Sequence, residues 1–348
     1  MKKVDYIIVG FGLAGLAFVR ELEKNNKSFI VFEDDSQHSS KVAGGMYNPV
    51  ILKRFTPVWD AKKQLEVALP FYKELEDKFK STYDIPMDIG RLLTSIEEQN
   101  NWFATCDHPL LADYMIPKIE TKTYNGVESP FGYGKLTKTG RIDVNSLLND
   151  YREYLIEMDC IYFEEFNHEV VQFENNAVQY QDIEATKIVF CEGFGIKRNP
   201  FFNYLPMREA KGELITIHAP ELDFDFVLKS AVFILPLGEH NFLVGATFNW
   251  KDKTSNPSEE GKNELVEKLN KIIKVNYKVI NQVAGIRPTV KDRRPLVGIH
   301  PKHSQVAILN GLGTRGVMIA PTVSNELYRY LENGKELRKE IDITRFSN

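Results

Sequence analysis

A glycine-rich turn joins two apolar segments near the start of the chain. Val4–Val9 is an unbroken run of mostly β-branched and aromatic residues, which is typical of a strand buried on both faces of a parallel sheet. The run from Leu16 to Lys24 has apolar residues at helical spacing, and Phe29–Phe32 is a second apolar strand. Between the first strand and the helix lie three glycines in the spacing Gly-x-Gly-x-x-Gly, at Gly10, Gly12 and Gly15. This order of segments predicts a βαβ unit.

The three glycines have distinct mechanical roles in such a unit. Gly10 permits a tight turn out of the strand, Gly12 lets the backbone approach a pyrophosphate, and Gly15 lets the helix pack closely on the sheet. The start of the helix, with Leu13 and Ala14, then faces the phosphates. The sequence therefore predicts a dinucleotide site built on this turn.

An acidic pair follows the second strand. Glu33 stands about 20 residues after the glycines, where an acid accepts hydrogen bonds from an adenosine ribose, and Asp34 lies beside it. An acid in place of an arginine disfavours a 2′-phosphate, so the pattern indicates FAD or NAD rather than NADP.

The composition is that of an ordinary folded protein with a weak overall charge. The chain has 348 residues, enough for about two domains. Its 44 Lys+Arg and 48 Asp+Glu give a formal net charge of −4, unlike a typical nucleic-acid binder, although a local basic pocket is compatible with it. The three cysteines, Cys106, Cys160 and Cys191, lack the spacing of a metal or disulfide framework, so we expect buried thiols and no metal site.

The N-terminal segment has some features of a targeting sequence. Lys2 and Lys3 precede an apolar stretch from Tyr6 to Val19, but a membrane span needs about 20 apolar residues, and the small-residue cleavage site of a secretory signal is missing. We therefore expect a soluble, cytoplasmic protein without a membrane span.

Further along, apolar periodicity predicts a mixture of helices and short strands. The predicted helices cover residues 57–80, 142–158, 258–274 and 316–332. The predicted strands cover residues 90–94, 168–173, 177–181, 188–191, 213–218, 231–236, 241–247 and 306–309.

After Glu33 the chain leaves the alternating pattern of an NAD dehydrogenase. It enters a loop rich in small residues, Lys41–Pro49, and here it resembles the D-amino acid oxidase family of flavoproteins, which includes glycine and sarcosine oxidases. In that family the corresponding loop wraps the flavin, so the resemblance assigns cofactor contacts to Gly44, Gly45 and Met46.

Other segments resemble the family in the same order along the chain. The segments 140–151, 211–214 and 235–247 are similar to its middle region. Val171 stands where a family backbone group meets the adenine. Cys191, Glu192 and Gly193 stand at the second phosphate-side turn, where Cys191-Glu192 replaces a commoner Ala-Thr or Ala-Gly type of pair.

The last third carries the most specific resemblance, in segments 284–298 and 310–321. The loop at Asn310 feeds a helix start, and such a loop directs backbone donors and partial positive charge at the flavin N1 and C2 carbonyl. The flavin-facing residues assigned by this resemblance are Gly311, Gly313, Thr314, Arg315 and Gly316.

Two arginines are the candidate catalytic residues, and both are also expected to contact the cofactor. The arginine that matches Arg287 pairs with the substrate carboxylate in amino acid oxidases of the family, and a planar bidentate fork suits that task. Arg315 is the second cationic candidate. The remaining cations in these segments are expected mostly at the solvated surface: Lys53, Arg54, Arg208, Lys211, Lys291, Arg293 and Arg294.

The resemblance implies an α/β fold of the glutathione-reductase type. A Rossmann-like FAD-binding domain, residues 1–85, 138–204 and 285–348, is interleaved with an α+β substrate domain with an antiparallel sheet, residues 86–137 and 205–284. FAD is expected to bind non-covalently, because the last cysteine is Cys191 and a flavin-linking cysteine would stand near the C-terminal strands. Phe233 replaces a tyrosine whose hydroxyl assists the carboxylate in many family oxidases.

The resemblance implies an FAD-dependent enzyme that oxidises the C–N bond of a small carboxylated amine or amino acid, with oxygen or another acceptor. Three alternatives remain open. Asp292–Pro295 and Gly311–Gly316 resemble the flavin half of a bifunctional bacterial tRNA-modifying enzyme, which removes an N-carboxymethyl group from a modified uridine. Oxidation of a 2-hydroxy acid or a polyol phosphate is the second alternative, and a binding module without redox chemistry is the third.

Overall fold

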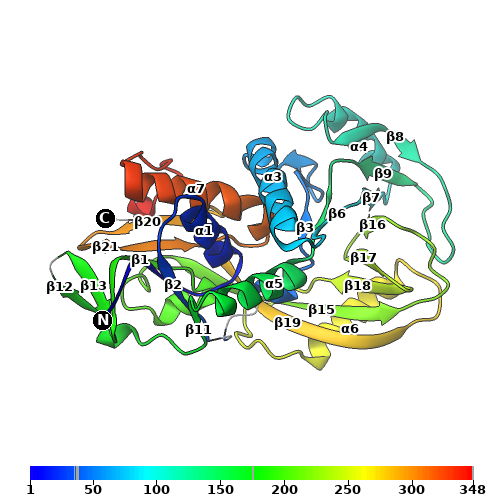
Figure 1. Cartoon of the computed structure of the whole chain (residues 1–348). Coiled ribbons are helices and arrows are strands. Elements are labelled where there is room, and N and C mark those ends of the chain that lie inside the picture. Colours follow the sequence, from blue (N-terminus) through cyan, green and yellow to red (C-terminus); the bar gives the residue numbers. More distant parts are fainter. Residues whose placement is uncertain (35, 37–38, 175, 347–348) are drawn as a thin grey trace.

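The computed structural model describes residues 1–34, 36, 39–174 and 176–346 and contains two large sheets (Figure 1). The first sheet has a parallel core in the order β11-β2-β1-β14-β21. These five strands are β1 (Lys2–Val9), β2 (Phe29–Phe32), β11 (Ile161–Tyr162), β14 (Ile183–Phe190) and β21 (His303–Asn310). Three antiparallel strands extend the sheet: β12 (Gln172–Glu174) and β13 (Ala177–Tyr180) beside the first half of β14, and β20 (Leu296–His300) beside β21.

The register of the parallel strands aligns their carboxyl ends. Val9 of β1 is paired with Phe32 of β2 and with Phe190 of β14. The residues that follow these strands, Gly10, Glu33 and Cys191, therefore meet at one edge of the sheet, which is where α/β sheets bind ligands. The prediction of a βαβ unit is confirmed by β1, α1 (Leu13–Lys24) and β2.

Helices cover the first sheet and share its core. α1 packs against α7 (Gly316–Asn333), which also packs against α3 (Ala61–Phe79). α5 (Val144–Glu157) packs on the other side of α1. Two short sheets lie nearby, one of β3 (Met46–Tyr47), β6 (Asp84–Pro86) and β10 (Gly140–Ile142), the other of β4 (Val50–Ile51) and β5 (Thr56–Pro57).

The second sheet has eight strands in the order β19-β15-β18-β17-β16-β7-β9-β8. Their bounds are β7 (Ile89–Leu92), β8 (Met115–Glu120), β9 (Tyr133–Leu136), β15 (Met207–His218), β16 (Val227–Lys229), β17 (Phe233–Gly238), β18 (Asn241–Gly245) and β19 (Lys278–Val290). All neighbours are antiparallel except β7 and β16, which are parallel. α6 (Glu259–Asn270) packs on β15, and α4 (Ile96–Cys106) packs on β8.

The long strand β19 links the two parts of the molecule. It pairs with β15 along almost its whole length, from Lys278 to Val290. The domain boundary predicted at residue 285 falls inside this continuous strand. The domain ranges remain predictions, while the two sheets give the mixed α/β architecture that the resemblance implied.

Several local predictions were wrong. Residues 168–173 were predicted as a strand, but His168–Val170 forms a 3-10 turn and β12 begins only at Gln172. Cys160 is partly exposed, whereas Cys106 and Cys191 are buried, and all three are free thiols. Lys211, expected at the surface, is buried with a relative exposure of 1%.

Within the residues described above, no helix combines the length and the apolar character that crossing a membrane requires.

Candidate active site

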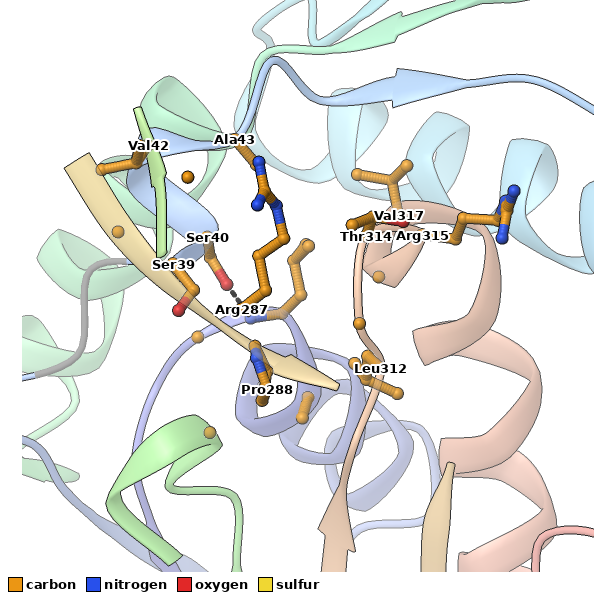
Figure 2. A pocket seen from close by; sticks show the side chains of 18 of the residues that line it. Ser39, Ser40, Val42, Ala43, Arg287, Pro288, Leu312, Thr314, Arg315 and Val317 are labelled. Atoms are coloured by element: carbon orange, nitrogen blue, oxygen red, sulfur yellow. Dashed lines mark hydrogen bonds between the residues drawn. The ribbon is translucent and has the colours of Figure 1, made fainter. Parts of the chain in front are cut away.

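A cavity of about 620 Å³ lies between the carboxyl edge of the first sheet and one face of the second. Figure 2 shows its central part, where the short helix α2 (Ser39–Val42), strand β19 and the start of α7 come together. Most of the predicted site residues line this cavity: Gly10, Gly12, Leu13, Ala14, Glu33, Asp34, Gly44, Gly45, Met46, Cys191, Glu192, Gly193, Arg287, Gly313, Thr314, Arg315 and Gly316.

The glycine turn fits the mechanical roles expected of it. Gly10 has a φ of +94°, and a Cβ there would lie 2.8 Å from the carbonyl oxygen of Cys191. A Cβ on Gly15 would come within 2.1 Å of the carbonyl oxygen of Gly10, so Gly15 does not line the cavity but permits the close helix packing. Gly12 is the N-cap of α1 and provides no side-chain cap, which leaves backbone donors of the first turn directed at the cavity. These features form a cradle for a pyrophosphate.

Glu33 has a partner that the sequence did not indicate. Arg152 of α5 donates from Nε to Glu33 Oε2 at 2.7 Å and from Nη2 to Oε1 at 2.6 Å. The same Nη2 donates to the carbonyl oxygen of Phe11 at 3.0 Å. A carboxylate has about four lone-pair positions, so Glu33 retains acceptor capacity for a ribose while Arg152 fixes its orientation.

The loop after β2 closes over β19. Ser39 Oγ donates to the carbonyl oxygen of Ile286, and Ser40 Oγ accepts from the backbone N–H of Leu13 at 3.2 Å (Figure 2). Gly45 has a φ of +66°, and a Cβ there would meet the carbonyl oxygen of Ile142 at 2.0 Å. Of the small residues predicted to wrap a flavin, Gly45 therefore lies where only a glycine fits.

The nucleotide end of the cavity is lined by Phe166 and His168, which sequence reasoning missed. His168 Nε2 lies 2.7 Å from Glu192 Oε1, and Asn199 Nδ2 donates to Glu192 Oε2 at 2.7 Å. Val171, predicted at the adenine, is not among the lining residues and instead packs beside the core under β12–β14. Its predicted contact with the adenine remains a prediction.

The C-terminal loop reaches the cavity from the end of β21. Asn310 Nδ2 donates to the carbonyl oxygen of Gly193 at 2.9 Å. The N–H of Gly313 donates to the carbonyl oxygen of Pro288 at 3.1 Å. Gly311, with a φ of +71°, does not line the cavity but turns the chain where a Cβ would meet Val290 at 2.5 Å. α7 then starts without a side-chain cap, so its first N–H groups face the cavity.

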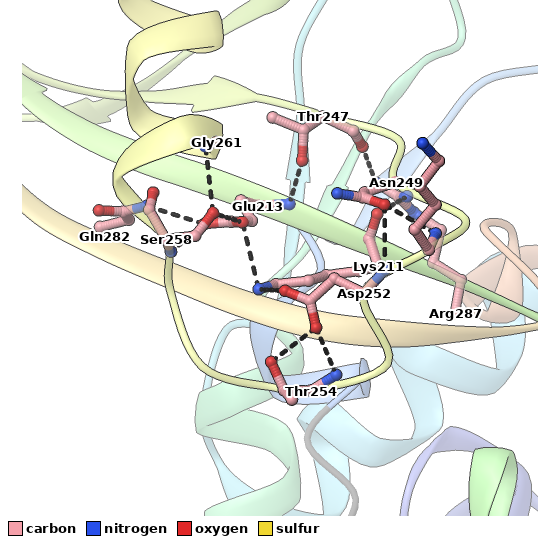
Figure 3. A network of polar contacts seen from close by, with 11 residues as sticks. Lys211, Glu213, Thr247, Asn249, Asp252, Thr254, Ser258, Gly261, Gln282 and Arg287 are labelled. Atoms are coloured by element: carbon pink, nitrogen blue, oxygen red, sulfur yellow. Dashed lines mark hydrogen bonds and ion pairs between the residues drawn. The ribbon is translucent and has the colours of Figure 1, made fainter.

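Arg287 of β19 lies across the neighbouring strand β15. Its Nη1 donates to the carbonyl oxygen of Lys211 at 3.3 Å, and its Nη2 donates to that of Thr247 at 3.1 Å (Figure 3). The ring centroid of Phe248 lies 4.9 Å from Cζ of the guanidinium. No carboxylate pairs with Arg287 within the described part of the chain, so its remaining donors are available to a ligand.

Burial lowers the pKa of Arg287 to about 10, which still leaves the guanidinium charged at neutral pH. A partly desolvated cation without an acidic partner attracts an anion strongly. This arrangement suits the binding of a carboxylate or a similar anion.

A buried ionic network lies beside the backbone segments that bind Arg287 (Figure 3). Lys211 Nζ pairs with Asp252 at 2.6 Å and with Glu213 at 3.3 Å. Glu213 accepts from Ser258 Oγ at 2.6 Å, and the hydrogen bond from Lys211 lowers the pKa of Asp252 to about 2. The network fixes the segment after β18, which carries the Thr247 carbonyl, to strand β15.

The side chains of Arg315 and Arg287 do not point toward one another (Figure 2). In Figure 2 the side chain of Arg287 extends toward Ala43, whereas that of Arg315 points away from it. Burial, with a smaller effect of Arg293, lowers the pKa of Arg315. The catalytic role predicted for Arg315 remains a prediction.

Comparisons with known proteins show what the chain is similar to. The model of the family DAO, FAD dependent oxidoreductase, matches residues 5–328. The tRNA 5-methylaminomethyl-2-thiouridine biosynthesis bifunctional protein MnmC of Marinobacter nauticus is 20% identical and covers 92% of this chain and 54% of its own length. The glycine oxidase of Bacillus subtilis is 27% identical over 147 residues, which is 40% of this chain and 39% of that protein.

The chain thus spans about half the length, or less, of these curated relatives. Among solved structures, glycine oxidase from Geobacillus kaustophilus superposes with a TM-score of 0.75 at 18% identity, covering 100% of this chain and 98% of that one. That likeness shows a shared fold.

Proposed function

The chain belongs to the DAO family of FAD-dependent oxidoreductases, and on this premise we propose that it oxidises the C–N bond of a small amine that carries a carboxylate. The observation that carries the proposal is Arg287, a partly buried cation in the cavity with two backbone carbonyls and an aromatic ring as its partners. A small anionic amine supplies the missing negative charge.

The residues around the cavity fit FAD. The α1 cradle at Gly10 and Gly12 receives the pyrophosphate, Glu33 the ribose, and the start of α7 the polar edge of the flavin ring. When bound, FAD supplies the two-electron oxidising chemistry of the family. The protein therefore has to bind, orient and shield the substrate.

Arg287 orients the substrate. Three of its five N–H donors remain after the two backbone contacts, enough for a bidentate pair with a carboxylate. Such a pair fixes the α-carbon relative to the cofactor site, which is the main requirement for hydride removal. Phe248 shields one face of the guanidinium and strengthens the pair by excluding water.

The reaction balances without a catalytic side chain. In the net reaction a hydride leaves the α-carbon of the neutral amine, water adds to the resulting iminium with release of a proton, and the C–N bond breaks to give a carbonyl compound and an amine. The final acceptor, oxygen or another two-electron acceptor, takes up the equivalent of that hydride and proton. Leu214 and Phe233 also line the cavity and give its wall an apolar part.

The test is anaerobic bleaching of the flavin absorbance near ~450 nm, a property of the cofactor. At least one of a series of carboxylated amines, with N-methylglycine, glycine and proline among them, is expected to bleach the purified protein, and 2-hydroxy acids and polyol phosphates are not. Protein that retains no flavin would contradict every redox function, and hydrogen peroxide formed in air would identify oxygen as the acceptor.

One observation favours a tRNA substrate as the second candidate. Phe248 and Trp250 stack edge to face at 4.8 Å and are about half exposed, at 50% and 49%, beside Arg287. Exposed aromatic rings bind nucleobases by stacking. The similarity to MnmC extends over 92% of the chain, but the net charge of −4 does not favour a large RNA. Bleaching by tRNA with an N-carboxymethylated uridine, and not by small amines, would establish this candidate.

A further inference from the structure

Lys229 lies in the same cavity and has no assigned role. It ends strand β16, in register with Arg91 of β7 and with Phe233 of β17. Paired residues in neighbouring strands project to the same face of a sheet, and Phe233 also lines the cavity. The side chain of Lys229 therefore belongs to the face of the second sheet that forms the cavity wall.

The described part of the chain provides no anion for this amine. Among the described residues, Lys229 has no hydrogen bond or ion pair, because the nearby acidic residues form ion pairs with other cations. Glu98 binds Arg91 and Glu264 binds Lys268. The acidic residues that line the cavity are all at its nucleotide end: Glu33, Asp34, Glu164, Glu165 and Glu192.

The surroundings make the ammonium form costly. Burial, followed by the charges of Arg91 and Lys268, lowers the pKa of Lys229 to about 8. A partly buried, unpaired lysine in a cavity is an uncommon arrangement outside functional sites. A negatively charged group on a ligand would remove the cost.

Lys229 and Arg287 reach the cavity from strands that are well separated in the second sheet. The guanidinium of Arg287 lies over Gly212 of β15, and the sheet order β15-β18-β17-β16 places Lys229 three strands away. At about 4.8 Å per strand the two backbones are separated by about 14 Å. The lysine stem covers part of this span, and a ligand with an anionic group at each end covers the rest.

We propose that the substrate carries a second anionic group, a carboxylate or a phosphate, which binds the amine of Lys229 while Arg287 holds the first carboxylate. This inference rests on the proposed function only for the role of Arg287. It narrows the substrate class to extended amines with two separated anionic groups, and it makes Lys229 a residue that determines specificity.

The test measures binding to the flavin-loaded protein by calorimetry, with ligands that cannot be oxidised as amines. Hexanoate, adipate and 5-phosphonopentanoate have similar lengths and differ in the charge at the far end. At least one of the two dianions is expected to bind about tenfold or more tightly than hexanoate, the scale of one charge-assisted hydrogen bond. The dianion that binds more tightly shows whether the second anionic group of the substrate is a carboxylate or a phosphate.

Three variants assign the preference to the residue. Lys229→Met is expected to abolish it and Lys229→Arg to retain it. Lys335→Met changes the net charge equally, is exposed just after the end of α7 and is expected to leave the preference intact. Circular dichroism confirms that each variant is folded.

Equal affinity for hexanoate and both dianions, a preference that survives Lys229→Met, or no binding of any of the three ligands would overturn the inference. The outcome is separate from that of the proposed function. A dianion preference that depends on Lys229 in a protein whose flavin no amine bleaches would support the anion site and contradict the amine chemistry.

Discussion

The guanidinium of Arg287 occupies the space that the missing side chain of Gly212 leaves free. A Cβ at position 212 would come within 2.0 Å of Nη2 and 2.2 Å of Cζ. Strand β15 therefore positions the arginine in two ways. The backbone of Gly212 leaves space for the guanidinium, and the carbonyl oxygen of Lys211 accepts a hydrogen bond from it. The position of the guanidinium therefore depends on the absence of a side chain at Gly212.

Gly212→Ala is expected to displace the guanidinium and to raise KM for a carboxylated amine about tenfold or more, because the bidentate geometry is lost. Flavin content should stay unchanged, since Gly212 is remote from the α1 cradle. The matched control is Gly285→Ala on the paired strand, where a Cβ meets only Val42, at 3.4 Å. An equal rise in KM for both variants would show that Gly212 has no special relation to Arg287.

Arg287→Ala is expected to cost about 2 kcal/mol or more of substrate binding, which corresponds to about a 30-fold rise in KM. Arg287→Lys keeps the charge but loses the planar fork, so it should recover only part of the loss. Steady-state kinetics with one carboxylated amine give the comparison. Unchanged kinetics in Arg287→Ala would refute the role of this residue.

The pair formed by Arg152 and Glu33 predicts a double-variant effect. Arg152→Met leaves a buried carboxylate without its partner, which typically costs about 3–5 kcal/mol, so the melting temperature should fall steeply. Adding Glu33→Gln removes the stranded charge and should restore most of the stability, while FAD retention stays low because the acceptor carboxylate is gone. Thermal melts and flavin content of both variants measure this, and full FAD retention in the double variant would contradict the ribose role.

The charge of Lys229 predicts a pH dependence of dianion binding. Free Lys229 is protonated below its pKa of about 8, and a bound anion raises that pKa. Dianion affinity should therefore be constant below about pH 8 and fall as the pH rises above it, while hexanoate, held by Arg287 with its pKa of about 10, should bind equally well up to about pH 9. The cations near Lys229, Arg91 and Lys268, are paired with Glu98 and Glu264. A flat dianion profile between about pH 7 and 9 would exclude Lys229 as the ligand-binding group.

The parts that sequence predicted well depend on local signals. The β1-α1-β2 unit follows from apolar periodicity and glycine spacing. These features require only neighbouring residues, so they can be recognised without tertiary information.

The parts that sequence missed depend on distant partners. Lys211 reads as a surface lysine, but Asp252, from a segment 41 positions away, pairs with it in the interior. Arg152 is separated by 119 positions from Glu33, so no spacing rule connects them. Only the strand order of the second sheet places Lys229 on the cavity wall, so the sequence could not indicate this position.

The most direct test of the amine chemistry is anaerobic flavin reduction by matched pairs of secondary amines, each compared as the free acid and as the uncharged amide. The proposed role of Arg287 predicts that the acid reduces the flavin and that the amide does so at least about 30-fold less efficiently, the loss of one charged pair. A flavin that stays oxidised with every carboxylated amine, or that is reduced equally well by acid and amide, would contradict the account.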